Sequence, residues 1–259
     1  MRAIWSGTIS FGLVNIPIKL FSAVHDSTLS MDLLDKHDHS HIRYARINPN
    51  TGKEVAWENI VKGYNYNNNY VVLTEKDFEK VNPKKSKTIE ISQFVKEEEV
   101  DTIYYDTPYY IEAEKSGEKA YTLLREALKQ SGKVAIGSYV FHTKENLCML
   151  KPYGNMILLL KMRFAEEIRD YSELNIPKNA SIKPSEIKMA IALINQLTPK
   201  KFSFNKYKDT YDEMLMKIIK LKAKGAKIPI PKFKIIHGKN NNLMSQLKSS
   251  LEHTRKKAS

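Results

Sequence analysis

A series of strand-like runs in the first 165 residues constrains the fold more than any other feature. The runs are rich in β-branched and aromatic residues and are separated by short turns, which is typical of β-strands. We expect seven or more strands, including a hairpin around NPNTG at 48–52 and the runs NYVVLTEKDF, KTIEISQFV, DTIYYDTPYYIEA, GKVAIGSYVF and NMILLLKMRF. Many strands joined by short turns favour a closed barrel over an open sheet.

The opening stretch, SGTISFGLVNIPIKLF at residues 6–21, is expected to form one bent strand of this barrel. Ile9 and Phe11 alternate with small or polar residues, as in a half-buried strand. Gly12 and Pro17 then interrupt the run, and such interruptions suit a bulge or a bend.

One helix interrupts the strands between residues 116 and 132. The segment SGEKAYTLLREALKQSG carries apolar residues at helical spacing and ends at Gly132, a residue that commonly terminates helices. Its apolar face consists of Ala120, Leu123, Leu124, Ala127 and Leu128. We expect this helix to cover one side of the barrel, so that residues 1–170 form a single barrel core.

The chain becomes helical after about residue 170. Two segments, KPSEIKMAIALINQLTP and DTYDEMLMKIIKLKAKG, place apolar residues at helical spacing, and Gly225 follows as a terminator. The two stripes are Ile187, Ala190, Ile191, Ile194 and Leu197 in the first helix, and Tyr211, Met214, Leu215, Ile218 and Ile219 in the second. We expect residues 171–226 to be a helical arm whose stripes are covered by the same barrel or by a second subunit.

Residues 227–259 are expected to hold an extended linker with Pro229 and Pro231, then a short helix and a basic tail. The helix, about 11 residues long, is marginal by itself, so we expect it to order on a partner, with docking on its own chain as the alternative. Its apolar residues are Leu243, Met244, Leu247 and Leu251, and the tail is Arg255, Lys256 and Lys257.

The net charge of +13 lies almost entirely at one end of the chain. Residues 1–180 hold 24 Lys and Arg against 24 Asp and Glu, whereas residues 181–259 hold 18 against 5. A balanced body with a basic end indicates an anionic partner, with nucleic acid ahead of a membrane. A basic surface that serves only solubility is the alternative.

Motifs that carry catalytic chemistry are missing from the sequence. It has no glycine-rich phosphate loop, GxGxxG, GxSxG or HExxH, so we expect no enzyme activity, no cofactor and no metal. The run HDHSH places His37, His39 and His41 close together, but such a run is more often a solvated turn than a metal site. Lysines are numerous enough to leave a Schiff-base nucleophile open, although none is marked out by its neighbours.

Cysteine content and hydropathy indicate the cellular compartment in which the protein is expected. The single cysteine, Cys148, excludes an intramolecular disulfide and is expected to be a buried small hydrophobe. The start of the chain has no signal-peptide pattern, and the longest apolar run, MILLL at 156–160, is too short to span a bilayer. We therefore expect a soluble, unexported protein.

Several segments in fixed order resemble the bacterial Ku family, which binds DNA double-strand-break ends in prokaryotic non-homologous end joining. These segments are WSGTISFGLVNIPIKLFSA, HIRYARINPNTGKEVAWENIVKGY, YVVLTEKDFEKV, TIEISQFV, IYYDTPYYI and GEKAYTLLREALKQSGKVAIG. The resemblance implies an α+β fold: an antiparallel β-barrel core, a bridging hairpin arm near residues 30–70 and a helical C-terminal arm. Many relatives have a CPxCG turn where this chain has Asn48 to Gly52, which argues against a metal role for that turn.

The resemblance also implies a function. A homodimer would form a ring around double-stranded DNA ends and recruit an ATP-dependent DNA ligase, ligase D, in the cytoplasm and in association with the nucleoid. On the implied bridge, the DNA-binding residues would be Arg43, Arg46, Lys53 and Lys62, and in the C-terminal helix the ligase-binding residues would be Leu243, Leu247 and Leu251. The location of the charge alone makes the tail cations Arg255, Lys256 and Lys257 a second expected DNA contact. A general nucleoid or RNA-binding protein without end specificity is the main alternative, and a lyase acting on abasic ends is a weaker one.

Overall fold

A computed structural model of the 259-residue chain describes residues 1–25, 28–81, 87–141, 144–177, 181–226 and 243–258, without the side chains of residues 243 and 252–258. The chain divides into two compact units, Met1–Tyr171 and Ser172–Ser259. The first unit contains a β-barrel and a long arm, and the second contains three of the α-helices.

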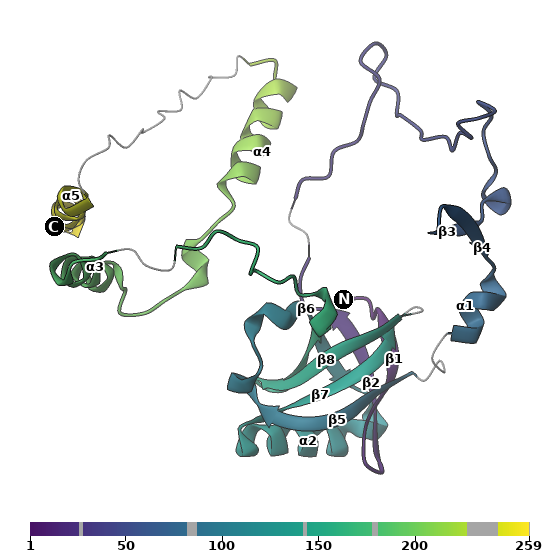
Figure 1. Cartoon of the computed structure of the whole chain (residues 1–259), viewed down its shortest axis with the longest axis horizontal. Coiled ribbons are helices and arrows are strands. Elements are labelled where there is room, and N and C mark those ends of the chain that lie inside the picture. The colour runs from purple at the N-terminus through teal and green to yellow at the C-terminus, as the bar shows by residue number, and fades with distance from the viewer. Residues whose placement is uncertain (26–27, 82–86, 142–143, 178–180, 227–242, 259) are drawn as a thin grey trace. The chain divides into compact units, whose positions relative to one another are not determined.

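The barrel consists of seven strands in the closed order β1-β2-β6-β9-β8-β7-β5 (Figure 1). The strands are β1 Trp5–Phe11, β2 Val14–Ser22, β5 Thr88–Lys96, β6 Tyr105–Ala113, β7 Lys133–Phe141, β8 Lys144–Tyr153 and β9 Met156–Met162. Every neighbouring pair is antiparallel except β1 and β5, which run parallel and close the barrel. The α+β class with a β-barrel core is confirmed, and the parallel pair arises because the chain leaves the sheet after β2 and returns beside β1.

The opening stretch forms two strands, so the prediction of one bent strand is wrong. Phe11 pairs with Val14, and the two residues between them reverse the chain. Gly12 has φ of 59°, a backbone conformation that glycine adopts without steric cost, so here it closes a hairpin where a bulge was expected. Pro17 lies inside β2 opposite Thr8.

The main core fills the barrel and continues under helix α2, Glu118–Ser131. Apolar side chains such as Ile9, Ile16 and Leu150 are buried inside the barrel, and Leu124 and Leu128 of α2 pack against them. The predicted cover of one barrel side by this helix is confirmed, and so is its end at Gly132, which has φ of 64°. The buried Cys148 is also as expected.

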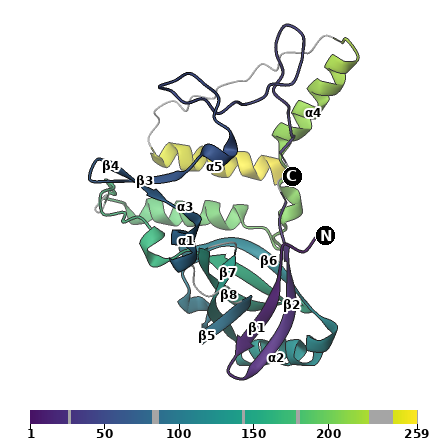
Figure 2. The same ribbon diagram turned by 90° about the vertical axis from the view of Figure 1, so that its right-hand side faces the viewer.

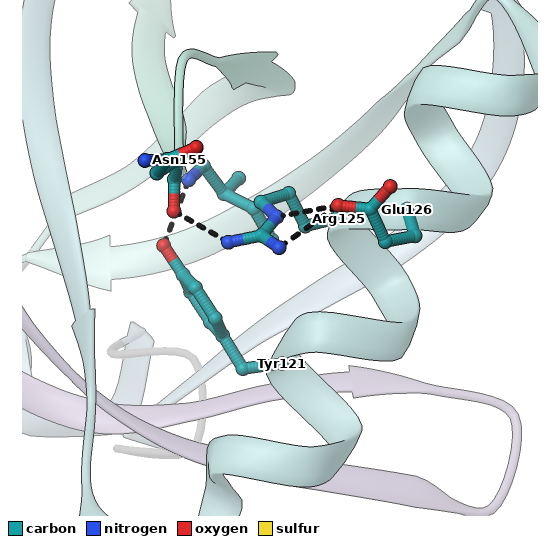
Figure 3. Close-up of polar contacts among 5 residues, drawn as sticks. Tyr121, Arg125, Glu126 and Asn155 are labelled. Carbon is teal, nitrogen blue, oxygen red and sulfur yellow. Dashed lines mark hydrogen bonds and ion pairs between the residues drawn. The ribbon is translucent and has the colours of Figure 1, made fainter.

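Tyr121 anchors α2 to the barrel (Figure 3). Its hydroxyl donates to the carbonyl oxygen of Ile111 at 2.9 Å and accepts from the backbone N–H of Ile157 at 2.7 Å. Burial raises the pKa of this phenol, so the proton needed for donation stays in place. One turn further along α2, Arg125 donates to the carbonyl oxygen of Asn155.

A second apolar cluster covers the opposite face of β7, β8 and β9. Val134, Ile136, Met149 and Met162 are buried there, and partly buried residues from the connection between β5 and β6 pack against them. This connection contains the 3-10 helices η2 Glu97–Glu99 and η3 Thr102–Tyr104. Because these strands are covered on both faces, their sequences are continuously apolar instead of alternating.

An arm, defined as residues 28–81, lies between β2 and β5. It contains η1 Trp57–Asn59, β3 Lys62–Tyr66, β4 Asn69–Leu73 and α1 Glu75–Val81. Strands β3 and β4 form a two-stranded hairpin whose turn residues, Asn67 and Asn68, both have positive φ, as a type I′ turn requires. The hairpin expected around 48–52 is present in short form: Ile47 pairs antiparallel with Glu54, and backbone hydrogen bonds join Asn48 to Lys53 and Val55 to Arg46. A second isolated bridge joins Leu34 to His41.

The second unit contains α3 Pro184–Leu197, α4 Thr210–Ala223 and α5 Leu243–Ala258, with η6 Phe204–Lys206 before α4. The remaining 3-10 helices, η4 Lys115–Gly117 and η5 Ala165–Glu167, belong to the first unit. Two helices after residue 170 are confirmed, and α5 has 16 residues where about 11 were expected. The predicted linker lies outside the described residues. No helix in the described part of the chain is long and apolar enough to cross a membrane.

Candidate nucleic-acid interface

The arm has no hydrophobic core. Not one of residues 28–81 is buried, and six are half-buried: Leu29, Asp35, Asn48, Val55, Leu73 and Asp77. Ordering a chain costs about 1 to 2 kcal/mol per residue in backbone entropy, which is ordinarily offset by burial of apolar surface. Burial of apolar side chains within the described chain therefore does not account for the order of the arm.

The four predicted bridge cations lie on this arm. Arg43, Arg46, Lys53 and Lys62 are all exposed. Within the described residues, none of the four has a carboxylate close enough for an ion pair. Each of these four exposed, unpaired cations can form an ion pair with a phosphate without breaking an existing ion pair.

Two of these cations are held by aromatic rings. The guanidinium of Arg46 lies 4.6 Å from the centre of the Trp57 ring, and the ammonium of Lys62 lies 4.9 Å from the Phe78 ring. A cation over an aromatic face is attracted by about 0.5 to 1 kcal/mol at an exposed site. The rings hold these two charges in place while leaving their hydrogen-bond donors available.

Exposed aromatic residues surround the cations. Five of them, each 63% to 82% exposed, are Tyr44, Trp57, Tyr64, Tyr66 and Tyr70. Neither these residues nor Phe78 were predicted from the sequence as part of the site, although aromatic residues interleaved with Arg and Lys between residues 43 and 70 were a usable signal.

The turn at 48–52 is closed by its own side chain. The Oδ1 atom of Asn48 accepts from the backbone N–H groups of Asn50 at 2.9 Å and Thr51 at 3.3 Å. Gly52 completes the turn with φ of 66° and donates to the Asn48 carbonyl oxygen at 2.9 Å. Hydrogen bonds thus close a turn that has no cysteine ligands in this chain.

The histidine run at 37–41 forms a tight loop. The carboxylates of Asp35 and Asp38 accept from the backbone N–H groups of His37 and Ser40, at 2.7 and 2.9 Å. The hydrogen bonds to Ser40 hold the pKa of Asp38 below its usual value. Among the residues that the structure describes, no group of three or more His, Cys, Asp or Glu is placed to hold a metal ion.

Several cations on the barrel differ from the four bridge cations because carboxylates pair with them. Asp106 lies 3.1 Å from the Lys161 ammonium and 3.6 Å from the Arg163 guanidinium, and Lys151 pairs with Glu97. Burial by itself would raise the pKa of Asp106, but the hydrogen bond and charge of Lys161, with smaller effects of Thr107 and Arg163, lower it overall.

The predicted C-terminal residues fall on α5. Arg255, Lys256 and Lys257 belong to its last turns, and their side chains lie outside the described part. Leu243 is its first residue, also without a described side chain, whereas Leu247 and Leu251 are half-buried. The seven predicted DNA-binding cations are thus divided between the two compact units, with four on the arm and three on α5.

Fold and arm together define a class of protein: a closed seven-stranded barrel with a long uncovered arm inserted between its strands and a helical second unit. The family model described as "Ku70/Ku80 beta-barrel domain" matches residues 10–222 of this chain. The match spans most of the barrel, the arm and both helices α3 and α4. The chain belongs to the Ku family.

Relatives of nearly the same length support this assignment. The chain is 38% identical over its whole length to "Non-homologous end joining protein Ku" of Coxiella burnetii, of which 98% is covered. It is 40% identical over 97% of its length to the protein of that name from Archaeoglobus fulgidus, of which 99% is covered. The Bacillus subtilis protein of that name is 36% identical over 99% of this chain and 83% of its own length.

Proposed function

We propose that this chain binds the ends of double-stranded DNA without sequence preference, as a homodimer that forms a ring around the duplex in non-homologous end joining. Membership of the Ku family supports the process. The observation that carries the proposal is the arm, because 54 consecutive residues without a buried side chain present four unpaired cations. A second copy and a DNA duplex together would supply the surface that the arm lacks.

Contacts to phosphate explain why binding would not depend on the base sequence of the DNA. Arg and Lys contacts to phosphate fix a protein on DNA but do not read bases, whereas sequence is read from base edges in the grooves. A ring lined with such contacts would track the duplex and slide along it. The protein would act by binding, in the cytoplasm and in association with the nucleoid, and not by catalysis.

The second unit is proposed to supply the subunit and protein contacts. Exposed apolar residues on α3 and α4, including Ile187, Ile194, Tyr211 and Met214, are 48% to 69% exposed, and a dimer contact would cover them. The α5 residues Leu243, Leu247 and Leu251 are proposed to dock ATP-dependent DNA ligase D. The tail cations Arg255, Lys256 and Lys257 would hold flanking DNA.

End recognition is tested by comparing one DNA sequence as a linear duplex and as a covalently closed circle, at moderate salt and with the mass of the protein measured in parallel. We expect a dimer that binds only the linear form and stays bound when bulky groups block the ends after loading. Equal binding to the circle, or to RNA, would contradict the ring and support a general nucleic-acid-binding protein.

Ligase recruitment needs a separate test. Leu247→Asp is expected to abolish stimulation of the ligase while end binding is unchanged. Ser249→Asp is the matched control, because it introduces the same charge at an exposed position of α5. Equal loss of ligation and end binding in Leu247→Asp would refute this division of roles.

A further inference from the structure

Helix α3 carries two apolar stripes, and only one of them is exposed. The exposed stripe consists of Ile187, Ile191, Ile194 and Leu197, which are 48% to 62% exposed. The covered stripe consists of Met189, Leu193 and Gln196, which are half-buried. With 3.6 residues per turn, the centres of the two stripes lie about 140° apart around the helix axis.

Helix α5 covers the second stripe. The two helices lie side by side in both views (Figures 1 and 2) and pack against each other. The side-chain Nε2 of Gln196, in the covered stripe, donates to the carbonyl oxygen of Leu251 at 3.4 Å. The half-buried residues of the described part of α5 are Met244, Leu247 and Leu251, which recur at helical spacing, while Lys248 and Ser249 between them are exposed.

The residues of α5 that pack on α3 are therefore the ones proposed to dock the ligase. One stripe of a helix cannot contact two apolar surfaces at the same time. We infer that the covered stripe of α3 is an intramolecular docking surface for α5, and that a partner protein must compete with α3 for Leu247 and Leu251. The competition with ligase rests on the proposed function, whereas the docking of α5 on α3 does not.

The contact between α3 and α5 is weak enough to be released. Its described apolar residues are half-buried and not fully buried, and the hydrogen bond from the Gln196 side chain to Leu251 is long at 3.4 Å. Because both helices belong to one chain, docking is intramolecular and needs little intrinsic affinity. A released α5 of 16 residues would be only marginally helical in water, so release should appear as loss of its backbone protection.

Hydrogen exchange on the full-length protein, followed by ligase binding, tests the inference with a matched pair of variants. Leu193→Asp places a charge in the covered stripe, and Ile191→Asp places the same charge in the exposed stripe two residues away. In the wild type and in Ile191→Asp we expect slow amide exchange across α5. In Leu193→Asp we expect exchange across α5 to become at least about tenfold faster, and ligase binding to become about tenfold tighter because the competing contact is lost.

Each other outcome overturns one part of the inference. Unprotected α5 in the wild type, or equal loss of protection in both variants, would show that α5 does not dock on this stripe. Faster exchange in Leu193→Asp with unchanged ligase affinity would refute the competition. Leu193→Ala, a milder change, should give the same direction if the Asp variant disturbs α3 as a whole. The proposed ligase site itself fails only if Leu247→Asp leaves ligase stimulation intact.

Discussion

Replacement of Tyr121 by Phe should weaken the barrel by a predictable amount. The change removes only the hydroxyl that joins α2 to β6 and β9, so the ring and its packing are kept. It leaves the backbone N–H of Ile157 and the carbonyl oxygen of Ile111 without this partner, and both residues are at most 3% exposed. An unsatisfied buried backbone group costs about 1 to 3 kcal/mol, so we expect the free energy of unfolding to fall by about 2 kcal/mol.

Urea unfolding followed by tryptophan fluorescence measures this loss. Trp5 reports on the barrel, because its ring contacts Tyr139 edge-on at 6.1 Å, and a Trp57→Phe background removes the signal of the arm. Tyr153→Phe is the control, since that ring is 56% exposed, and surface changes usually stay within about 0.5 kcal/mol. A loss of less than about 0.5 kcal/mol in Tyr121→Phe would show that the hydroxyl does not satisfy Ile157, and would refute the reasoning.

Three further predictions concern the arm, the core and acid stability. If Arg43 contacts phosphate in both copies of a dimer, Arg43→Gln should reduce the magnitude of the slope of log affinity against log salt concentration by about 1.8, measured by titration on linear duplex. Lys151→Gln is the control, because the Lys151 ammonium is already paired with Glu97, and it should leave the slope unchanged. Cys148 is fully buried and burial raises the pKa of its thiol, so a thiol reagent should label it only after unfolding; rapid labelling of the native protein would contradict the barrel core. The pKa of Asp106 is lowered in the folded state, so its ion pairs stabilise the protein at pH values above 3.8, and this stabilisation is lost as the pH falls through the folded pKa. The difference in free energy of unfolding between wild type and Asp106→Asn should therefore shrink on acidification. A difference that grows would refute the pairing.

The barrel could be predicted because most of its strands are bounded by turn residues. β8 was missed because cover on both faces removes its alternation, as in β9, and because its apolar run, LCML, is shorter than MILLL of β9 and lies in a segment with charged residues at Lys144, Glu145 and Lys151. On the arm, alternation around 42–55 predicted a hairpin, and only a short one forms. None of residues 42–55 is buried, so no core extends the pairing beyond the bridge of Ile47 with Glu54 and the backbone hydrogen bonds beside it.

The exposed stripe of α3 could be found from periodicity, but the covered stripe could not. Met189 and Leu193 lie on a helix with apolar residues on more than half of its circumference, and periodicity alone does not say which part a partner covers. The partner, α5, is separated from α3 by more than 40 residues, and only three-dimensional contacts reveal the pairing. The four arm cations could be named in advance, whereas their lack of carboxylate partners and the two aromatic rings under them could not.

The distribution of buried residues divides the molecule by its need for a partner. In the first unit the buried side chains all belong to the barrel and to α2, while the arm in the same unit has none. In the second unit no described side chain is buried, and α3 keeps an apolar stripe exposed after α5 has covered the other. On the proposed function, the free energy that orders the arm and covers α3 would come from association, so folding of these segments would be linked to dimer and DNA binding. It follows that a variant that weakens association should increase hydrogen exchange in the arm first and in the barrel strands last.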